Sequence, residues 1–175
     1  MVRRYSAGIA VATAVLVAGT GATYAVGTNA APPAARVAVA SAAQPSTQLP
    51  SRAQIAALFD RWNAALATGD PNRVADLYTP DAVLLPTLST IRTDRAGIVD
   101  YFRTFLQSKP VGRIQQRVIT VLGPTSAVDT GLYQFTLTNQ DGTKSTVDAR
   151  YTFVYALRGG SWLIVSHHSS KVPTG

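Results

Sequence analysis

The sequence contains no cysteine and no glutamate, and it has a single methionine. Without cysteine the chain can form no disulfide, no thiolate metal site and no covalent intermediate on a cysteine nucleophile. A lipid-modified N-terminal cysteine is excluded for the same reason. The 175 residues are 46% hydrophobic and 14% charged, a composition too apolar for a chain that is disordered throughout. The length favours one domain with additional segments.

Charged residues are few, and their distribution argues against a nucleic-acid partner. The formal net charge is +7, but Arg3, Arg4 and Arg36 lie within the first fifty residues. The other basic residues are scattered, with no basic run and no stripe of Lys and Arg along a predicted helix. Such a run or stripe is typical of a surface that binds phosphate groups. We therefore expect no nucleic-acid partner.

The first fifty residues have the pattern of an export segment followed by a linker. Arg3 and Arg4 precede an apolar stretch, Ala7 to Ala18, which has the length of a signal-peptide apolar region and is short for a membrane span. We predict a signal peptide over residues 1–30 and a secreted, extracytoplasmic protein. The alternative is an uncleaved N-terminal anchor, the only case in which we expect membrane contact. Residues 31–50, rich in Ala and Pro, are predicted to be a disordered linker. The working domain is then 51–173.

Helical periodicity dominates the first half of this domain. Ser51 and Gln54 have the spacing of a capping box. The apolar residues behind them recur at helical spacing: Ile55, Leu58, Phe59, Trp62 and Leu66. A second, shorter helix is predicted from Pro71, and a third after Asp94. Two short strands are predicted between these helices, on either side of Pro86.

From residue 113 onward the hydrophobic period changes to two. Four strands are predicted, over about 113–122, 126–138, 144–157 and 161–170. We expect the odd-numbered residues to face the helices and the even-numbered ones to face outward. A bulge at Gly131 would reverse this parity upstream of it. The predicted fold is α+β: three N-terminal helices packed on a curved, mainly antiparallel sheet, with a cone-shaped cavity between them.

Two stretches resemble a known family. Residues 69–78 (GDPNRVADLY) resemble the start of a nuclear transport factor 2-like, or SnoaL-like, domain. The closing residues 160–173 (GSWLIVSHHSSKVP) resemble the association domain of calcium/calmodulin-dependent protein kinase II and its bacterial SgcJ/EcaC-type relatives. The resemblance implies the cone-shaped fold and a hub that assembles from dimers. Kinase hubs carry arginines in their cavity, and the simplest register places Tyr133, Phe153 and Ser169 there.

No motif of the kinase itself is present. The sequence lacks the glycine-rich nucleotide loop, the catalytic-loop signature and the metal-binding Asp motif. We therefore expect no kinase activity, and we expect no cofactor.

His167 and His168 are the first candidates for chemistry. Neighbouring residues of a strand point to opposite faces, so the pair cannot chelate one metal ion, and no metal site is predicted. His167 is a candidate general base or ligand donor in the cavity, or a hydrogen-bonded residue at a strand end. Asp129 shares its parity and is the candidate acid/base partner.

Two sets of residues complete the predicted site. The residues expected to line the cavity are Trp62, Tyr78, Tyr101, Tyr133, Phe153, His167 and Ser169. The residues expected to face a second subunit are Trp162, Ile164, His168 and Arg150. A strand that carries large apolar groups on both faces needs a covering layer on each, which a second copy of the chain supplies.

Three functions remain open at this point. The first is an exported oligomerisation and small-ligand-binding module that forms a homodimer or a higher oligomer. The alternative is a cofactor-independent enzyme of the SnoaL or ketosteroid-isomerase type, which performs proton transfer, cyclisation or hydration with a cavity His. The third is a cell-surface binding protein whose pocket is purely apolar.

Overall fold

The computed structural model describes residues 48–173. The predicted signal peptide and nearly all of the predicted linker therefore lie outside the described residues. No helix within the described part of the chain is long and apolar enough to cross a membrane.

The helices begin where the sequence predicts. Helix α1 (Arg52–Ala67) starts at a complete capping box, in which Ser51 Oγ accepts from the Gln54 amide and Gln54 Oε1 accepts from the Ser51 amide. Helix α2 (Pro71–Ala75) is short, and α3 (Arg95–Phe105) begins after the Asp94 cap and continues into the 3-10 turn η1 (Leu106–Ser108). The predicted second helix is confirmed from Pro71, but it is only five residues long, and a strand begins soon after it at Tyr78.

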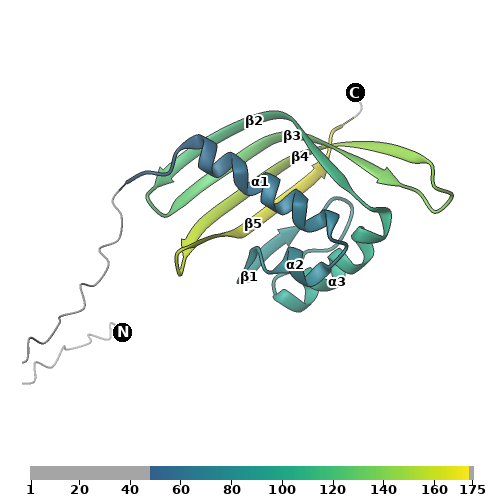
Figure 1. Cartoon of the computed structure of the whole chain (residues 1–175), viewed down its shortest axis with the longest axis horizontal. Coiled ribbons are helices and arrows are strands. Elements are labelled where there is room, and N and C mark those ends of the chain that lie inside the picture. The colour runs from purple at the N-terminus through teal and green to yellow at the C-terminus, as the bar shows by residue number, and fades with distance from the viewer. Residues whose placement is uncertain (1–47, 174–175) are drawn as a thin grey trace, which may run out of the picture. The chain divides into compact units, whose positions relative to one another are not determined.

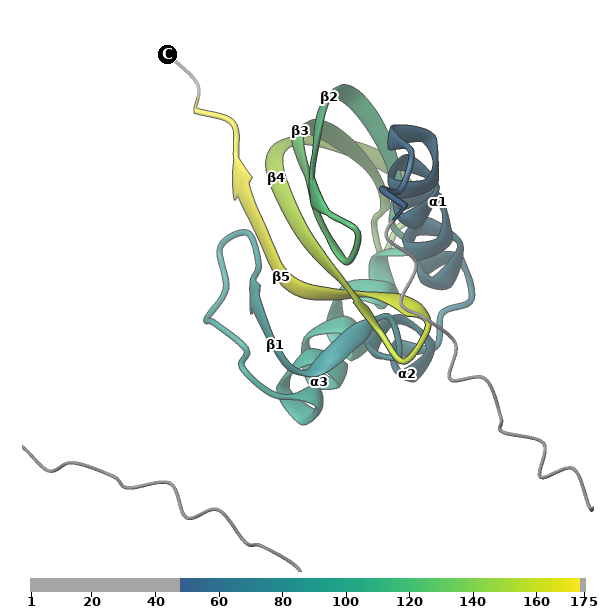
Figure 2. The same cartoon turned by 90° about the vertical axis from the view of Figure 1, so that its left-hand side faces the viewer.

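The strands form one five-stranded sheet in the order β1-β5-β4-β3-β2. The four long strands are antiparallel, and β1 pairs with β5 in parallel. The strand bounds are β1 (Tyr78–Leu85), β2 (Val111–Gly123), β3 (Ser126–Thr138), β4 (Lys144–Arg158) and β5 (Ser161–Lys171). The sheet is curved, with α1 lying across its concave face and α2 and α3 near β1 (Figures 1 and 2). The predicted α+β architecture is confirmed.

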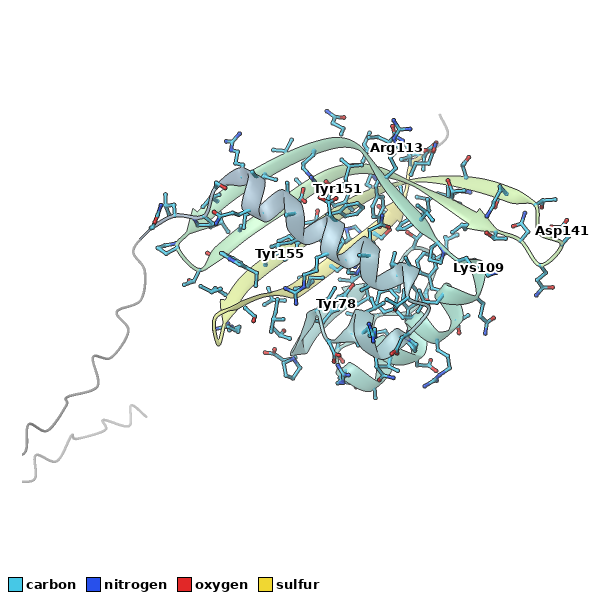
Figure 3. All side chains as sticks on the ribbon, in the orientation of Figure 1. Tyr78, Lys109, Arg113, Asp141, Tyr151 and Tyr155 are labelled. Carbon is cyan, nitrogen blue, oxygen red and sulfur yellow. The ribbon has the colours of Figure 1, made fainter. Side chains whose placement is uncertain are left out.

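The core lies between α1 and the concave face of the sheet. The side chains of Ile55, Phe59, Trp62 and Leu66 from α1 are at most 2% exposed. They pack against odd-numbered residues of β3 and β4, as the alternation predicted. Tyr78, Tyr151 and Tyr155, labelled in Figure 3, belong to this core and are at most 5% exposed. The helical side of the sheet is therefore the buried side.

The bulge predicted at Gly131 lies instead in the neighbouring strand. Gly131 stays in register with β4, and the shift falls in β2 between Ile114 and Gln116. A Cβ at Gly131 would lie 2.0 Å from the carbonyl oxygen of Gln116, so only glycine fits beside this bulge. Because β3 is not bulged, Asp129 keeps its odd parity and faces the helices.

A second bulge, in β5, changes the predicted interface. His167 pairs with Phe153, but Ile164 pairs with Tyr155, so Val165 is the extra residue. The bulge reverses the parity upstream, and Ile164 is 2% exposed in the core. Trp162 likewise faces the helical layer and packs against that core. The prediction that Trp162 and Ile164 face outward is therefore wrong.

Candidate functional site

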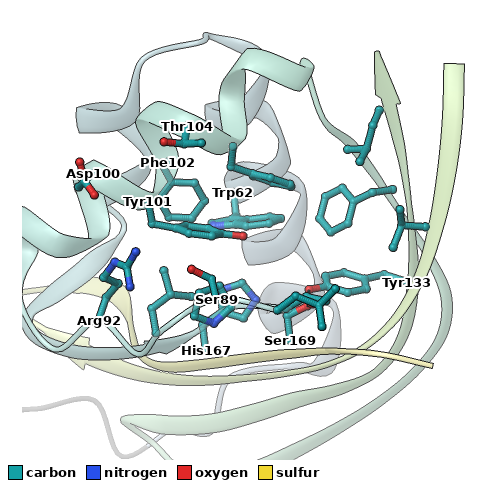
Figure 4. Close-up of a pocket in the computed structure, with 18 residues that line it drawn as sticks. Trp62, Ser89, Arg92, Asp100, Tyr101, Phe102, Thr104, Tyr133, His167 and Ser169 are labelled. Carbon is teal, nitrogen blue, oxygen red and sulfur yellow. Dashed lines mark hydrogen bonds between the residues drawn. The ribbon is translucent and has the colours of Figure 1, made fainter. Parts of the chain in front are cut away.

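A cavity of about 440 Å³ opens between α3, the segment after β1, and the concave face of the sheet. Its walls are mainly apolar and aromatic, as Figure 4 shows. The predicted lining residues found there are Trp62, Tyr101, Tyr133, His167 and Ser169. A concave, mostly apolar space with a few polar groups is the usual form of a small-molecule site.

Two predicted lining residues lie behind the wall. Tyr78 and Phe153 do not contact the cavity, although both are buried on its side of the sheet. The Phe153 ring stacks on the His167 ring, with centroids 4.0 Å apart. Their assignment as lining residues is therefore corrected. Both contact His167, which together with Trp62 forms this part of the cavity wall.

Trp62, Tyr78 and His167 form a hydrogen-bonded chain that we call the relay cluster. Trp62 Nε1 donates to the Tyr78 hydroxyl oxygen at 3.1 Å, and the Tyr78 oxygen lies 2.9 Å from His167 Nδ1. All three side chains are at most 5% exposed. His167 Nε2 is buried without a hydrogen-bond partner among the described residues. The cluster therefore joins α1, β1 and β5 and ends at the cavity.

The partners in this chain fix the His167 tautomer. Trp62 Nε1 can only donate, so the Tyr78 oxygen accepts there and its own proton remains for His167 Nδ1. His167 Nε2 then carries the ring proton. In the opposite tautomer two buried groups, the Tyr78 hydroxyl proton and the Nε2 lone pair, would both lack partners. Leaving one group unpaired costs less than leaving two.

The His167 ring is neutral at ordinary pH. Burial lowers its pKa to about 3, with a smaller contribution from the nearby His168. A base with that pKa is a weak proton acceptor near neutral pH. The arrangement therefore makes His167 a hydrogen-bond donor through Nε2, in line with the ligand-donor interpretation of the sequence.

A second set of neutral polar groups lies on the same wall. The Tyr133 hydroxyl donates to Ser169 Oγ at 2.6 Å, and Thr87 Oγ1 lies 2.6 Å from that same oxygen. Tyr101 faces them from α3, and burial raises the pKa of its hydroxyl to about 12. These hydroxyls stay protonated at ordinary pH, so they add polarity without charge.

The charged lining residues, Arg92 and Asp100, belong to less buried positions. Asp100 is exposed, and Arg103 Nη1 lies 3.0 Å from its Oδ1. Arg92 directs its Nη1 at the carbonyl oxygen of Thr90, 2.6 Å away. The sequence did not reveal Arg92, Thr87 or Ser89 as lining residues, because the segment between β1 and α3 has no hydrophobic period.

Asp129 belongs to a different buried group, which we call the ion-pair cluster: Arg117, Asp129 and Tyr151. The Tyr151 hydroxyl donates to Asp129 Oδ1 at 2.9 Å, and Arg117 Nε lies 3.2 Å from the same oxygen. Asp129 is 0% exposed. Burial raises its pKa, although the Tyr151 hydrogen bond and Arg117 partly oppose this.

The structure does not bring Asp129 and His167 together. The register places Phe153 of β4 between Asp129 of β3 and His167 of β5. Asp129 is bonded to Tyr151, and it does not line the cavity. The hypothesis of a direct His–Asp acid/base couple therefore lacks the required geometry.

The outer face of the sheet carries the other two predicted interface residues. Arg150 and His168 are exposed and line a groove of about 520 Å³ across β2 to β5, together with Val118 and Leu132. Within residues 48–173, no group of three or more His and Asp side chains is placed to hold a metal ion.

Fold and cavity together define the class of protein. The structure resembles a nuclear transport factor 2-like superfamily protein from Salmonella enterica serovar Typhimurium, with TM-score 0.62 and 22% identity over 70% of this chain and 92% of that one. A ketosteroid isomerase-like protein from Erwinia carotovora atroseptica aligns with TM-score 0.58 and 19% identity over 70% of this chain and 96% of that one. At such identities the likeness establishes the fold, which is nuclear transport factor 2-like.

Sequence similarity narrows this class to one family. The model of the calcium/calmodulin dependent protein kinase II association domain matches residues 51–173. A protein from Xanthomonas campestris, described as such an association domain, is 52% identical, with TM-score 0.70 over 75% of this chain and 99% of that one. The chain therefore belongs to the calcium/calmodulin-dependent protein kinase II association domain family. None of the curated proteins compared matches it.

Proposed function

We propose that this chain is an exported, self-associating module that holds a small organic ligand in its cavity and has no kinase activity. The observation that carries the proposal is the family match over residues 51–173, because the family is named for association. The relative from Xanthomonas campestris bears the same description. Export is supported by the arginines and the apolar stretch near the N-terminus.

The outer face of the sheet is the surface that we propose for self-association. Its groove crosses four strands and combines apolar side chains with the exposed Arg150 and His168. Val118, which lines this groove, is 55% exposed. Within residues 48–173 no second layer covers this face, and exposed apolar side chains are typical of a surface that docks a partner. A homodimer through this face would cover them.

The cavity supports the ligand-binding part of the proposal. It has a volume suited to a small molecule, and its inner wall holds a buried donor, His167 Nε2, that has no partner in the described chain. The enzymatic alternative is less well supported. It needs a proton acceptor in the cavity, and the lowered pKa of His167, about 3, makes that ring a poor one.

Light scattering coupled to size exclusion tests the self-association of the full chain. We expect an oligomer at micromolar concentration, and a shift toward monomer for Val118→Asp, because a charge buried in an interface is costly. Ile91→Asp is the matched control: Ile91 is also 55% exposed but lies in the segment between β1 and α3. A monomeric wild-type protein, or equal effects of the two substitutions, would contradict the proposed interface.

N-terminal sequencing of the protein recovered from its native host tests export. A new N-terminus near residue 30 in the extracytoplasmic fraction supports the secreted form. An intact N-terminus in the membrane fraction supports the anchor, and an intact N-terminus in the cytoplasm contradicts both.

A further inference from the structure

We infer that the cavity selects uncharged aromatic compounds that carry a carbonyl group, and that His167 Nε2–H donates a hydrogen bond to the carbonyl oxygen. This inference rests on the proposed ligand-binding function and specifies its ligand class.

The direction of the His167 ring follows from its partners. Nδ1 is turned to Tyr78, which lies behind the cavity wall. The two ring nitrogens point in different directions, so Nε2 points away from Tyr78, while the ring itself lines the cavity. No described side chain accepts from Nε2. A buried donor without an acceptor is costly, and a ligand oxygen placed there would relieve that cost.

The surroundings of His167 favour a neutral acceptor. Its ring is stacked on Phe153 and meets Trp62 edge-on, with centroids 5.4 Å apart. The other polar groups on this wall are the hydroxyls of Tyr133 and Ser169, which are hydrogen-bonded to each other. A carboxylate here would lose its water and gain one neutral donor, which does not compensate for burying a full charge. A carbonyl oxygen needs only the one donor.

The charged lining residues do not change this conclusion. Arg92 and Asp100 carry opposite signs, and each has a partner outside the cavity, Thr90 and Arg103 respectively. The Asp100 charge is paired with Arg103, whereas Arg92 donates to a neutral carbonyl and keeps its positive charge. Arg92 comes from the segment between β1 and α3 and not from the sheet wall that holds His167, so a carbonyl oxygen bound at Nε2 does not require it.

The walls favour a flat ligand. Tyr101, Phe102 and Phe105 contribute aromatic rings from α3, opposite the sheet wall that holds His167, and Phe135 adds a ring from β3. Aromatic walls bind flat rings through their faces and edges. A volume of about 440 Å³ accommodates a compound of one or two rings.

Three naphthalene probes test the inference on the full chain by calorimetry. The probes are 2-acetylnaphthalene, its carbon isostere 2-isopropenylnaphthalene, and 2-naphthoate, which differ in acceptor and charge but little in shape. We expect the ketone to bind about tenfold more tightly than the isostere, the ratio that one hydrogen bond to a buried donor supplies. We expect the carboxylate to bind more weakly than the ketone.

Two substitutions link the selectivity to His167. In His167→Leu the ketone and the isostere should bind equally, because no donor remains. In His167→Gln the amide can still donate, and a preference for the ketone should return. Should neither variant fold, ¹⁵N NMR of the wild-type histidine rings gives a second test. We expect His167 to be protonated at Nε2, and that proton to shift on adding the ketone but not the isostere. His168→Gln assigns the two rings, since the chain has only two histidines.

The outcomes separate this inference from the proposed function. Equal affinity for ketone and isostere, tightest binding of the carboxylate, or a His167 ring protonated at Nδ1 would overturn the inference and leave ligand binding intact. Failure of all three probes to bind would overturn the inference together with the ligand-binding part of the proposed function. Self-association would still stand.

Discussion

The relay cluster and the ion-pair cluster lie on the same face of the sheet, with His167 on β5 and Asp129 two strands away on β3. The two clusters bury their polar groups in different ways. The relay cluster uses neutral groups and ends at the cavity with His167 Nε2 unpartnered. The ion-pair cluster places the charge of Arg117 beside that of Asp129, leaves Asp129 Oδ2 without a hydrogen-bond partner among the described residues, and does not reach the cavity. The buried carboxylate therefore contributes to structure, whereas the neutral imidazole is the group that we propose for binding a ligand.

Removing the carboxylate from the ion-pair cluster should give the largest effect. Asp129→Ala leaves the Arg117 guanidinium, whose side chain is 22% exposed, without its counterion. We expect the free energy of unfolding to fall by about 3 kcal/mol, measured by urea denaturation. The matched control is the double variant Asp129→Leu with Arg117→Met, which should recover most of this loss. A loss below about 1 kcal/mol in the single variant would show that the pair is not a structural one.

Acidification should affect the two clusters in opposite directions. His167 has a folded pKa of about 3, below its ordinary value of 6.5, so the unfolded chain binds the extra proton between these values. Stability from this group is present above pH 6.5 and is lost as the pH falls, by about 1.4 kcal/mol per unit. At pH 4 the loss from His167 is about 3 kcal/mol.

The pKa of Asp129 is raised, so this carboxyl takes up a proton more readily in the folded state. The contribution of Asp129 to the free energy of unfolding therefore becomes more favourable as the pH falls through its folded pKa. It is lost as the pH rises through that value. Between pH 7 and pH 4 the free energy of unfolding, measured by denaturation, should depend less steeply on pH in His167→Gln than in the wild type. An unchanged slope would mean that His167 is not buried in its neutral form.

The smallest effect is expected within the relay cluster itself. Tyr78→Phe removes the acceptor of Trp62 Nε1 and the donor to His167 Nδ1. We expect a loss of about 1–2 kcal/mol in the free energy of unfolding, since buried polar groups are left unpaired. Tyr101→Phe is the control, because the Tyr101 hydroxyl lies outside the relay. Equal losses in the two variants would argue against the relay.

Local patterns in the sequence predicted the elements and the face on which most site residues lie. Ser51 and Gln54 predicted the start of α1, and the alternation in β3 and β4 put Tyr133 and Asp129 on the helical side. These features depend on residues close together in the chain, where spacing alone determines which side chains meet. For the same reason the α+β fold could be predicted from the sequence.

The errors arose where distant segments meet. The bulge at Val165 left no signal, because Leu163, Ile164 and Val165 are all apolar and a slip of one residue leaves such a run unchanged. The relay joins Tyr78 to His167, which are 89 residues apart, and no local pattern predicts such a contact. The same holds for Phe153, whose screening from the cavity depends on its neighbours in the folded state.

The most direct test of the central claim is a ¹⁵N NMR titration of His167 in the full chain from pH 7.5 to pH 4. The buried relay predicts that the ring stays neutral throughout, with Nε2 protonated and Nδ1 accepting from Tyr78. A ring that takes up a proton near pH 6.5, or one protonated at Nδ1 when neutral, would contradict the account.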